Sequence, residues 1–310
     1  MLKDKSLFVT GGAGTLGHAI AERRKREGWT GRMTVYSSDT HKHEKMRRLY
    51  PDVNFVQGDI RNPETLYNAM VGHDVVLHLA AVKVIPASEQ WSLDTIDVNI
   101  NGSINVCVQA ISAGIKHVLG ISTDKVCHSA NAYGATKYLM EKVFQEYSRI
   151  DSGTQFHLVR YGNVLESNGS VLEAWRKAQE DGKPLIVTDP EMTRFWISPQ
   201  QAVDLVISAV KLESGLVLIP KMKALSIGKL AEYTVGAGYK FEKIQIRPGE
   251  KMHETLLTEE ERFYATESQD FFFLRPSTSP KVVTPVEKTY SSDTAPLLTK
   301  TELDELLRNE

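Results

Sequence analysis

A glycine-rich turn that follows a short apolar run near the N-terminus constrains the fold of this chain most strongly. The run Leu7-Phe8-Val9 fits a buried parallel strand, and it leads directly into glycines at positions 11, 14 and 17. Gly11 allows a tight turn, Gly14 lets the backbone approach a pyrophosphate, and Gly17 lets the following helix pack closely on the strand. This spacing predicts a strand–turn–helix unit that binds a dinucleotide.

Apolar runs and helical patterns alternate from residue 5 to residue 163. The expected strands cover residues 7–9, 33–36, 53–57, 74–78, 116–121 and 156–160. This alternation predicts an α/β fold with a doubly wound parallel sheet of the Rossmann type and right-handed crossovers. Ligands of such sheets bind beyond the carboxyl ends of the strands. We therefore expect residues 1–163 to form a dinucleotide-binding domain.

The alternation weakens after residue 163, which predicts a second unit with a different role. Residues 164–310 are expected to form a smaller mixed substrate-binding domain, while residues 195–220 return to the large sheet. The elements of this domain are expected within residues 168–182, 224–238 and 250–275. The stretch 276–296 is rich in Ser, Thr and Pro and is expected to be an extended surface segment. A final amphipathic helix is expected over residues 301–308.

Residues at the ends of the expected strands are candidates to hold the dinucleotide. Asp39 suits the free ribose hydroxyls of NAD, whereas a basic residue at this place suits the 2′-phosphate of NADP. Asp59 is placed to contact the adenine edge, and the small residue Ala81 lets the cofactor lie across the strand ends. The predicted cofactor site comprises Gly11, Gly14, Thr15, Leu16, Gly17, Ser37, Ser38, Asp39, Lys42, Asp59, Ile60, Ala81, Lys83, Tyr133 and Lys137.

Tyr133 and Lys137 are four residues apart in a segment with a helical apolar stripe, so they share one face of the expected helix. A cation beside a phenol favours the phenolate, and we expect Lys137 to lower the pKa of Tyr133. Tyr133 would then take a proton from a substrate hydroxyl. The alternative is a core tyrosine beside a solvated lysine, but the upstream glycine-rich turn favours a reaction centre.

Five short motifs together have a pattern known from one enzyme family. They are Thr123-Asp124-Lys125, Tyr133-Gly134-Ala135-Thr136-Lys137, Arg160-Tyr161-Gly162-Asn163-Val164, Met192-Thr193-Arg194-Phe195-Trp196 and Arg247-Pro248-Gly249-Glu250-Lys251. The combination resembles the inverting UDP-N-acetylglucosamine 4,6-dehydratases of the pseudaminic acid synthesis type, within the extended short-chain dehydrogenase/reductase family. The similarity extends from the first expected strand to the last expected helix.

This resemblance implies inverting 4,6-dehydration of a UDP-hexose. The expected substrate is UDP-N-acetylglucosamine, and the expected product is UDP-2-acetamido-2,6-dideoxy-L-arabino-hexos-4-ulose. Tyr133 is implied to take the 4-hydroxyl proton as hydride leaves C4, and Thr123 to hydrogen-bond the 4-oxygen. Neutral Lys125 then removes the C5 proton, neutral Asp124 donates to the departing C6 hydroxyl, and hydride returns to C6. Burial is expected to favour both neutral forms, because desolvation disfavours charge.

The resemblance also implies which residues hold the substrate. An arginine fork suits a pyrophosphate, although Arg194 and Arg247 have ordinary surface ion pairs as their alternative role. Asn99 lies in an expected long helix over 93–113, where its alternative role is that of a polar helix residue. The predicted substrate site comprises Lys83, Asn99, Asn163, Thr193, Arg194, Arg247 and Glu250.

The chain departs from the family pattern at three places. Ser38 replaces an arginine that is expected to grip the 2′-phosphate, so NADP is predicted and NAD remains open. Lys83-Val84-Ile85-Pro86 replaces Lys-His-Val-Pro, which changes the substrate edge of the expected site. Glu166 stands where glycine is expected, in the stretch Glu166-Ser167-Asn168-Gly169-Ser170 near an anionic ligand.

Composition bounds the partners and the compartment. The net charge of −2 gives no global basic field for nucleic acid, and two cysteines make no disulfide framework. No apolar run reaches membrane-spanning length, and the N-terminus lacks a signal-peptide pattern, so we expect a cytoplasmic protein. His41 and His43 are two residues apart and do not share a helix face, so no metal is assigned. The assembly of relatives predicts a homo-oligomer.

Two other functions are also compatible with the sequence. A UDP-sugar 4-epimerase needs Tyr133, Lys137 and tightly held NAD, but it does not need Asp124 and Lys125. A catalytically silent nucleotide-binding scaffold on the same fold needs none of them, because a fold alone does not establish chemistry. Loss of water from the substrate separates the dehydratase from both.

Overall fold

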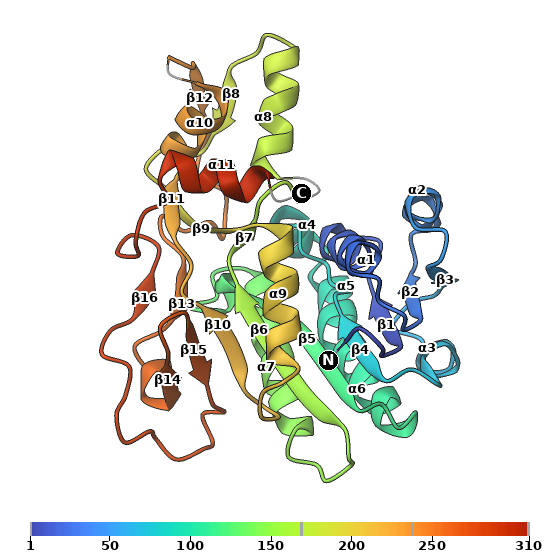
Figure 1. The fold of residues 1–310 in the computed structure, drawn as a ribbon. Coiled ribbons are helices and arrows are strands. Elements are labelled where there is room, and N and C mark those ends of the chain that lie inside the picture. Colours follow the sequence, from blue (N-terminus) through green and yellow to red (C-terminus); the bar gives the residue numbers. More distant parts are fainter. Residues whose placement is uncertain (1, 168–169, 237, 309–310) are drawn as a thin grey trace.

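A nine-stranded sheet runs through the computed structural model, which describes residues 2–167, 170–236 and 238–308 (Figure 1). Its strand order is β14-β15-β10-β6-β5-β4-β1-β2-β3. The strands are β1 (Leu7–Thr10), β2 (Met33–Ser37), β3 (Asn54–Gln57), β4 (Val75–His78), β5 (His117–Thr123), β6 (Gln155–Tyr161), β10 (Val217–Pro220), β14 (Ala265–Glu267) and β15 (Phe271–Leu274). Within this sheet, β3, β2, β1, β4, β5, β6 and β10 are parallel to one another. Strand β15 pairs antiparallel with β10, and β14 pairs antiparallel with β15. The order reverses beside β1, which confirms the predicted doubly wound sheet.

Helices connect the parallel strands and cover both faces of the sheet (Figure 1). They are α1 (Thr15–Glu27), α2 (Thr40–Leu49), α3 (Pro63–Met70), α4 (Ile85–Gln90), α5 (Ser92–Ile96), α6 (Gly102–Ser112), α7 (Ala132–Tyr147) and α9 (Pro199–Ala209). Helix α1 packs against α9, whereas α6 packs against α3 and α7. Every residue of β1 is buried, because helices lie on both sides of it. None of the helices in the described ranges has the length and apolarity needed to cross a bilayer.

The long helix predicted over 93–113 is interrupted. Helix α5 is followed by a π-helical turn at Asp97–Asn101, and α6 continues from Gly102. Single π turns often occur at functional sites, because they rotate the residues that follow. Asn99 lies within this turn and is buried.

A second hydrophobic cluster forms a smaller lobe, which stands above the sheet in Figure 1. Trp175, Leu185, Leu230 and Leu303 belong to this cluster. Further elements of the chain lie in this lobe or connect it with the large sheet. They are β7 (Asn163–Val164), α8 (Val171–Glu180), β8 (Leu185–Val187), β9 (Thr193–Ile197), β11 (Ala224–Ser226), α10 (Ile227–Val235), β12 (Phe241–Lys243), β13 (Thr255–Leu257), the 3₁₀ turn η3 (Glu261–Tyr264), β16 (Tyr290–Ser291) and α11 (Lys300–Arg308). The predicted final helix corresponds to α11.

Two expectations for the C-terminal part need correction. Strands β14 and β15 complete the large sheet, although the sequence placed 250–275 in the smaller unit. The stretch 276–296 contains little regular structure, but it is not simply a surface segment, since Val286, Ser292 and Ala295 are buried. Strand β16 within it pairs antiparallel with β13. Apolar and small residues scattered through a polar stretch gave no periodic signal of this burial.

Candidate active site

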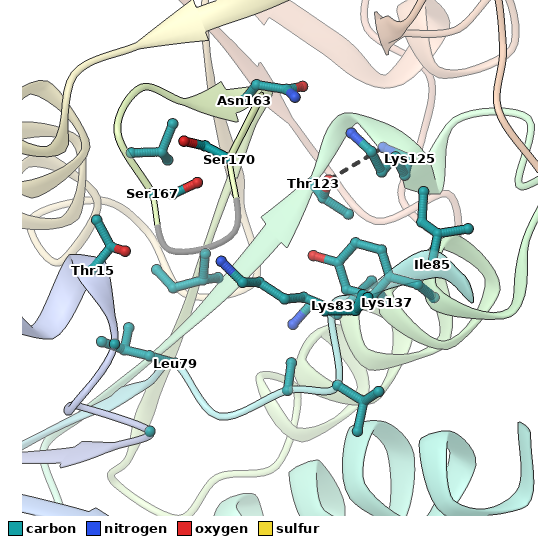
Figure 2. Close-up of a pocket in the computed structure, with 18 of the residues that line it drawn as sticks. Thr15, Leu79, Lys83, Ile85, Thr123, Lys125, Lys137, Asn163, Ser167 and Ser170 are labelled. Atoms are coloured by element: carbon teal, nitrogen blue, oxygen red, sulfur yellow. Dashed lines mark hydrogen bonds between the residues drawn. The ribbon is translucent and has the colours of Figure 1, made fainter. Parts of the chain in front are cut away.

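A cavity of about 1070 Å³ lies beyond the carboxyl ends of β1, β4, β5 and β6 and reaches into the smaller lobe. Figure 2 shows Thr15 on one side of this cavity and Thr123 and Lys125 on the other. Every predicted site residue lines the cavity except Asn99, Asp124 and Thr193. The cavity therefore brings together residues that are more than two hundred positions apart in the chain, from Gly11 to Glu250.

The glycine-rich turn has the shape that a dinucleotide phosphate requires. Gly11 has a φ of +63°, and a Cβ on it would lie 2.7 Å from the Cα of Ala80. A Cβ on Gly17 would overlap the carbonyl oxygen of Gly12, so the start of α1 packs directly on the turn. Gly14 occupies the N-cap of α1 and brings no capping side chain. The first turn of α1 therefore presents its N-terminus to the cavity, which fits the pyrophosphate of a dinucleotide.

The end of β2 is already held by hydrogen bonds within the protein. Asp39 caps α2 by accepting from the amide of Lys42 at 3.0 Å, and its other oxygen pairs with the Lys42 Nζ at 3.0 Å. Ser37 Oγ lies 2.6 Å from His43 Nε2. Ser38 is exposed beside them. Lys42 is therefore the cation that this strand end offers to the cavity.

Arg61 was not predicted, and it lines the cavity beside Asp59, the residue expected to contact adenine. Its guanidinium forks onto Asp59, with Nε 3.0 Å from Oδ1 and Nη2 2.6 Å from Oδ2. A third nitrogen donates to Asp94 at 2.8 Å. The hydrogen bond from Arg61 lowers the pKa of Asp59. Two carboxylates thus fix Arg61 across the mouth of the cavity.

The stretch predicted to be catalytic follows directly from the sheet. Strand β5 ends at Thr123, and a 3₁₀ turn, η2 (Asp124–Val126), redirects the chain. Asn131 then caps α7 by accepting from the amide of Gly134 at 2.8 Å. Glu89 from α4 accepts from the amide of Ala132 at 2.5 Å. Both caps fix the first turns of α7, which carry Tyr133 and Lys137.

Lys125 forms an ion pair with Asp124, which corrects the expectation that burial keeps Lys125 neutral. Lys125 Nζ lies 2.8 Å from Asp124 Oδ1, and Asp124 is fully buried. Burial lowers the pKa of Lys125, but the charges of Asp124 and Glu254 outweigh it, and the pKa stands above its ordinary value. Desolvation alone was the wrong basis for the prediction, because the two groups are desolvated together and neutralise each other.

The expected effect of Lys137 on Tyr133 is also corrected. Burial raises the pKa of Tyr133, and the neighbours that lower it are Lys125 and the hydrogen bond with Thr123. Lys137 is buried, its Nζ lies 2.8 Å from Met140 Sδ, and burial lowers its pKa to about 7. Lys125 is therefore the cation that acts most strongly on Tyr133 in this structure.

Asn99 and Thr193 lie away from the cavity surface. The Asn99 amide accepts from the amide of Val82 at 2.8 Å, and its Nδ2 lies 3.0 Å from both Val82 O and Thr136 Oγ1. Thr193 Oγ1 lies 2.8 Å from His253 Nδ1 and 2.7 Å from Ser292 Oγ. These contacts occupy both side chains, so we infer that they support neighbouring loops and do not contact substrate.

Other predicted substrate ligands do line the cavity. Asn163 Oδ1 is buried and has no hydrogen-bond partner among the described residues. Arg194 donates to the carbonyl of Thr193 at 2.7 Å, and Glu250 accepts from the amide of Arg247 at 3.2 Å. Burial, and then the charge of Lys42, lower the pKa of Lys83. Figure 2 shows Asn163 on the side of the cavity opposite Lys83.

Glu166 has a structural explanation. It keeps a positive φ of 53°, which suits the glycine expected there, and its carboxylate forms an ion pair with Arg176 of α8. Glu166 does not line the cavity. Its charge is therefore compensated by α8. Asn168 and Gly169 of the same departure lie outside the described residues.

Glu254 is the most important residue that the sequence did not reveal. It is 3% exposed, lines the cavity, and places Oε1 3.8 Å from Lys125 Nζ. It lies about 130 residues after Lys125 in a segment without regular structure. Only its place three residues after the motif Arg247–Lys251 offered a signal.

Comparison with known proteins identifies the family of this chain. The profile of a family described as "Polysaccharide biosynthesis protein" matches residues 7–276. The chain belongs to this family. Within it, the chain is 34% identical to "UDP-N-acetylglucosamine 4,6-dehydratase (inverting)" of Campylobacter jejuni subsp. jejuni serotype O:2, over 89% of this chain and 84% of that protein. It is 35% identical to a "UDP-glucose 4-epimerase" of Rickettsia conorii, over 88% and 83% of the two chains.

The fold of this family member also matches a solved structure over its full length. The X-ray structure of Pen from Bacillus thuringiensis has a TM-score of 0.91 and 31% sequence identity, and the match covers 100% of this chain and 98% of that one. The match therefore includes both the large sheet and the smaller lobe.

Proposed function

We propose that this protein is a nucleotide-sugar 4,6-dehydratase that inverts C5, with UDP-N-acetylglucosamine as its substrate. One observation carries the proposal: Lys125 lines the cavity together with Tyr133, and its Nζ is hydrogen-bonded to the buried carboxylate of Asp124. The Campylobacter relative bears the same activity in its name. An epimerase needs a base at O4 but has no use for an acid–base pair directed at C5 and C6.

The proton positions in the resting pair suit this reaction. The pair holds one proton, which lies on Lys125 in the ion pair. Transfer of that proton along the 2.8 Å hydrogen bond to Asp124 gives a neutral amine and a neutral carboxylic acid in one step. The mechanism implied by the sequence needs these two forms. One proton transfer within the ion pair therefore gives the neutral Lys125 and the neutral Asp124 that the reaction needs.

Three residues of this chain move the protons in the proposed reaction. Tyr133 takes the proton of the 4-hydroxyl, and C4 becomes a ketone, which acidifies C5. Lys125 takes the C5 proton, Asp124 gives its proton to O6, and the C6–O bond breaks, so water leaves and a C5–C6 double bond forms. After hydride has entered C6, a proton enters C5 from the opposite face. A bound nicotinamide dinucleotide supplies the hydride acceptor for C4 and the donor for C6.

NADP is proposed as the cofactor, with Lys42 as the cation for the 2′-phosphate in place of an arginine at Ser38. Lys42 lines the cavity and shares its charge with Asp39. Calorimetric titration with NADP⁺ and NAD⁺ tests this, and we expect the K42A variant to lose the preference for NADP⁺. Tighter binding of NAD⁺ by the wild-type protein would contradict it.

For the nucleotide part of the substrate we propose Arg194, Arg247 and Asn163 as ligands. Arginines suit the diphosphate. The Oδ1 of Asn163 is buried and has no hydrogen-bond partner within residues 2–167, 170–236 and 238–308, which suits a hydrogen-bond donor of the ligand. Thr123 is proposed to hold the 4-oxygen together with Tyr133.

Proton NMR of UDP-N-acetylglucosamine incubated with the enzyme in deuterated water tests the function. We expect a new C6 methyl signal, deuterium at C5 and an L-configured ring. A methyl signal with a D-configured ring overturns the inversion. Conversion to UDP-N-acetylgalactosamine without a methyl signal identifies an epimerase, the activity named for the Rickettsia relative.

Three further proposals follow from the same assignment. The product would feed a pathway of the pseudaminic acid type, the enzyme would work in the cytoplasm, and it would be a homo-oligomer. Product analysis with a cell lysate, cell fractionation and light scattering test them in turn.

A further inference from the structure

Residues 247–254 contact the stretch from Lys125 to Asn131. Asn131 Nδ2 donates to the carbonyl of Gly249 at 2.9 Å, and Lys251 Nζ donates to the carbonyl of Cys127 at 2.7 Å. Glu254 then places its carboxylate beside Lys125. Three contacts from one segment thus fix the turn that carries Lys125.

Glu254 is buried, and Ser292 holds its backbone in place. Its backbone amide donates to Ser292 Oγ at 2.8 Å, and its backbone carbonyl accepts from the Ser292 amide at 2.8 Å. Its Oε2 lies 3.2 Å from Lys251 Nζ but makes no hydrogen bond among the described residues. Lys125 Nζ therefore lies close to two buried carboxylates, 2.8 Å from Asp124 Oδ1 and 3.8 Å from Glu254 Oε1.

We propose that Glu254 is a positioning residue that keeps, on the pair formed by Lys125 and Asp124, the single proton that dehydration requires. This inference rests on the proposed function. If the pair loses its proton to water, Asp124 has none to give to O6. A second buried carboxylate favours the protonated pair, because an anion within about 4–6 Å stabilises a cation.

Each charged group that faces Lys125 has a definite effect. Asp124 and Glu254 hold the ammonium, and Arg194 opposes it. Burial raises the pKa of the Tyr133 phenol, and the charge of Lys125 opposes this rise. Behind Glu254 lies Lys251, whose cation compensates the second carboxylate. Removal of the Glu254 charge therefore makes Lys125 lose its proton at lower pH.

The first experiment measures this proton without any turnover. Competitive labelling with acetic anhydride at a fixed pH reports the neutral fraction of Lys125, read by mass spectrometry with Lys83 as an internal reference. We expect E254Q to label Lys125 about tenfold faster or more, since the pKa falls by about 1–3 units. S292A removes one of the two hydrogen bonds between Ser292 and the Glu254 backbone but keeps the other bond and the carboxylate, so its labelling rate should match the wild type. Equal rates for E254Q and wild type overturn the proposal.

The second experiment uses the reaction. In E254Q, kcat/KM should begin to fall at a pH about 1–3 units lower on the alkaline side than in the wild type, while S292A keeps the wild-type limb. E254D, which keeps a shorter anion, should lie between them, and it serves for both measurements if E254Q does not fold. An unshifted alkaline limb in E254Q and E254D overturns the proposal. A wild-type enzyme that dehydrates no UDP-hexose refutes the proposed function, whereas the labelling result still decides the effect of Glu254 on Lys125.

Discussion

The two ends of the cavity are built in different ways. At the cofactor end, the turn from Gly11 to Gly17 is a local structure, in which a strand, a turn and a helix follow one another within about twenty residues. At the substrate end, Lys125 depends on Glu254, which arrives from a segment far along the chain. Local geometry is sufficient to hold a phosphate, whereas a lysine that shares its proton requires charges from several directions.

The largest effect is expected from K125M, which removes the base at the substrate end. We expect kcat to fall by about 10²–10⁴-fold, because general acid–base groups contribute rate factors of that size. The Kd for the cofactor should stay at the wild-type value. K142M serves as the matched control, since Lys142 lies on α7 with its Nζ over the ring of Tyr138 and does not line the cavity. A loss of cofactor affinity in K125M would mean that the substrate end of the cavity also contributes to cofactor binding.

The next effect is structural and concerns the support of the substrate end. Arg160 is fully buried and pairs with Glu141 of α7 and Glu261 of η3, each at 2.7 Å. R160M leaves two carboxylates without their cation and should lower the free energy of unfolding by about 3–5 kcal/mol. Chemical denaturation measures this. K221M breaks an exposed ion pair with Glu267 and should cost less than about 1 kcal/mol. Equal costs for the two variants would contradict the role of Arg160.

A smaller effect is expected at the cofactor end. G17A introduces a methyl group against the Gly12 carbonyl and should cost about 1–3 kcal/mol through overpacking. Cofactor affinity should fall while the acid–base pair stays intact. G28A is the matched control, because a Cβ at Gly28 meets nothing within 4 Å, although its positive φ adds strain. Titration with the cofactor compares them, and unchanged affinity in G17A would show that the turn tolerates displacement.

The smallest effect is expected from E166G, which restores the glycine of the family pattern. The ion pair with Arg176 is partly exposed, so its loss should change stability by no more than about 1 kcal/mol. The KM for the substrate should stay within about twofold of the wild type, because Glu166 does not line the cavity. A large rise in KM would place Glu166 at the substrate after all.

The same difference explains what could be predicted from the sequence. The sheet and the glycine turn follow from periodicity and spacing, which are short-range signals. The position of Lys125 in the cavity follows from its place at the end of β5. The charge state of Lys125 could not be predicted from the sequence, because tertiary packing brings Glu254 close to it. Asn99 was expected to face the substrate, but a π turn directs its amide to the backbone of Val82.

The position of β10 in the sheet has a consequence for synthesis on the ribosome. Strand β6 ends at Tyr161, and its neighbour β10 begins only at Val217. At synthesis rates of about 5–20 residues per second, the edge of β6 stays unpaired for several seconds after it has emerged. Strands β15 and β14 follow later still, and they add to the other edge of β10 by antiparallel pairing. The nascent chain thus exposes a hydrophobic sheet edge for which a chaperone is the natural temporary partner.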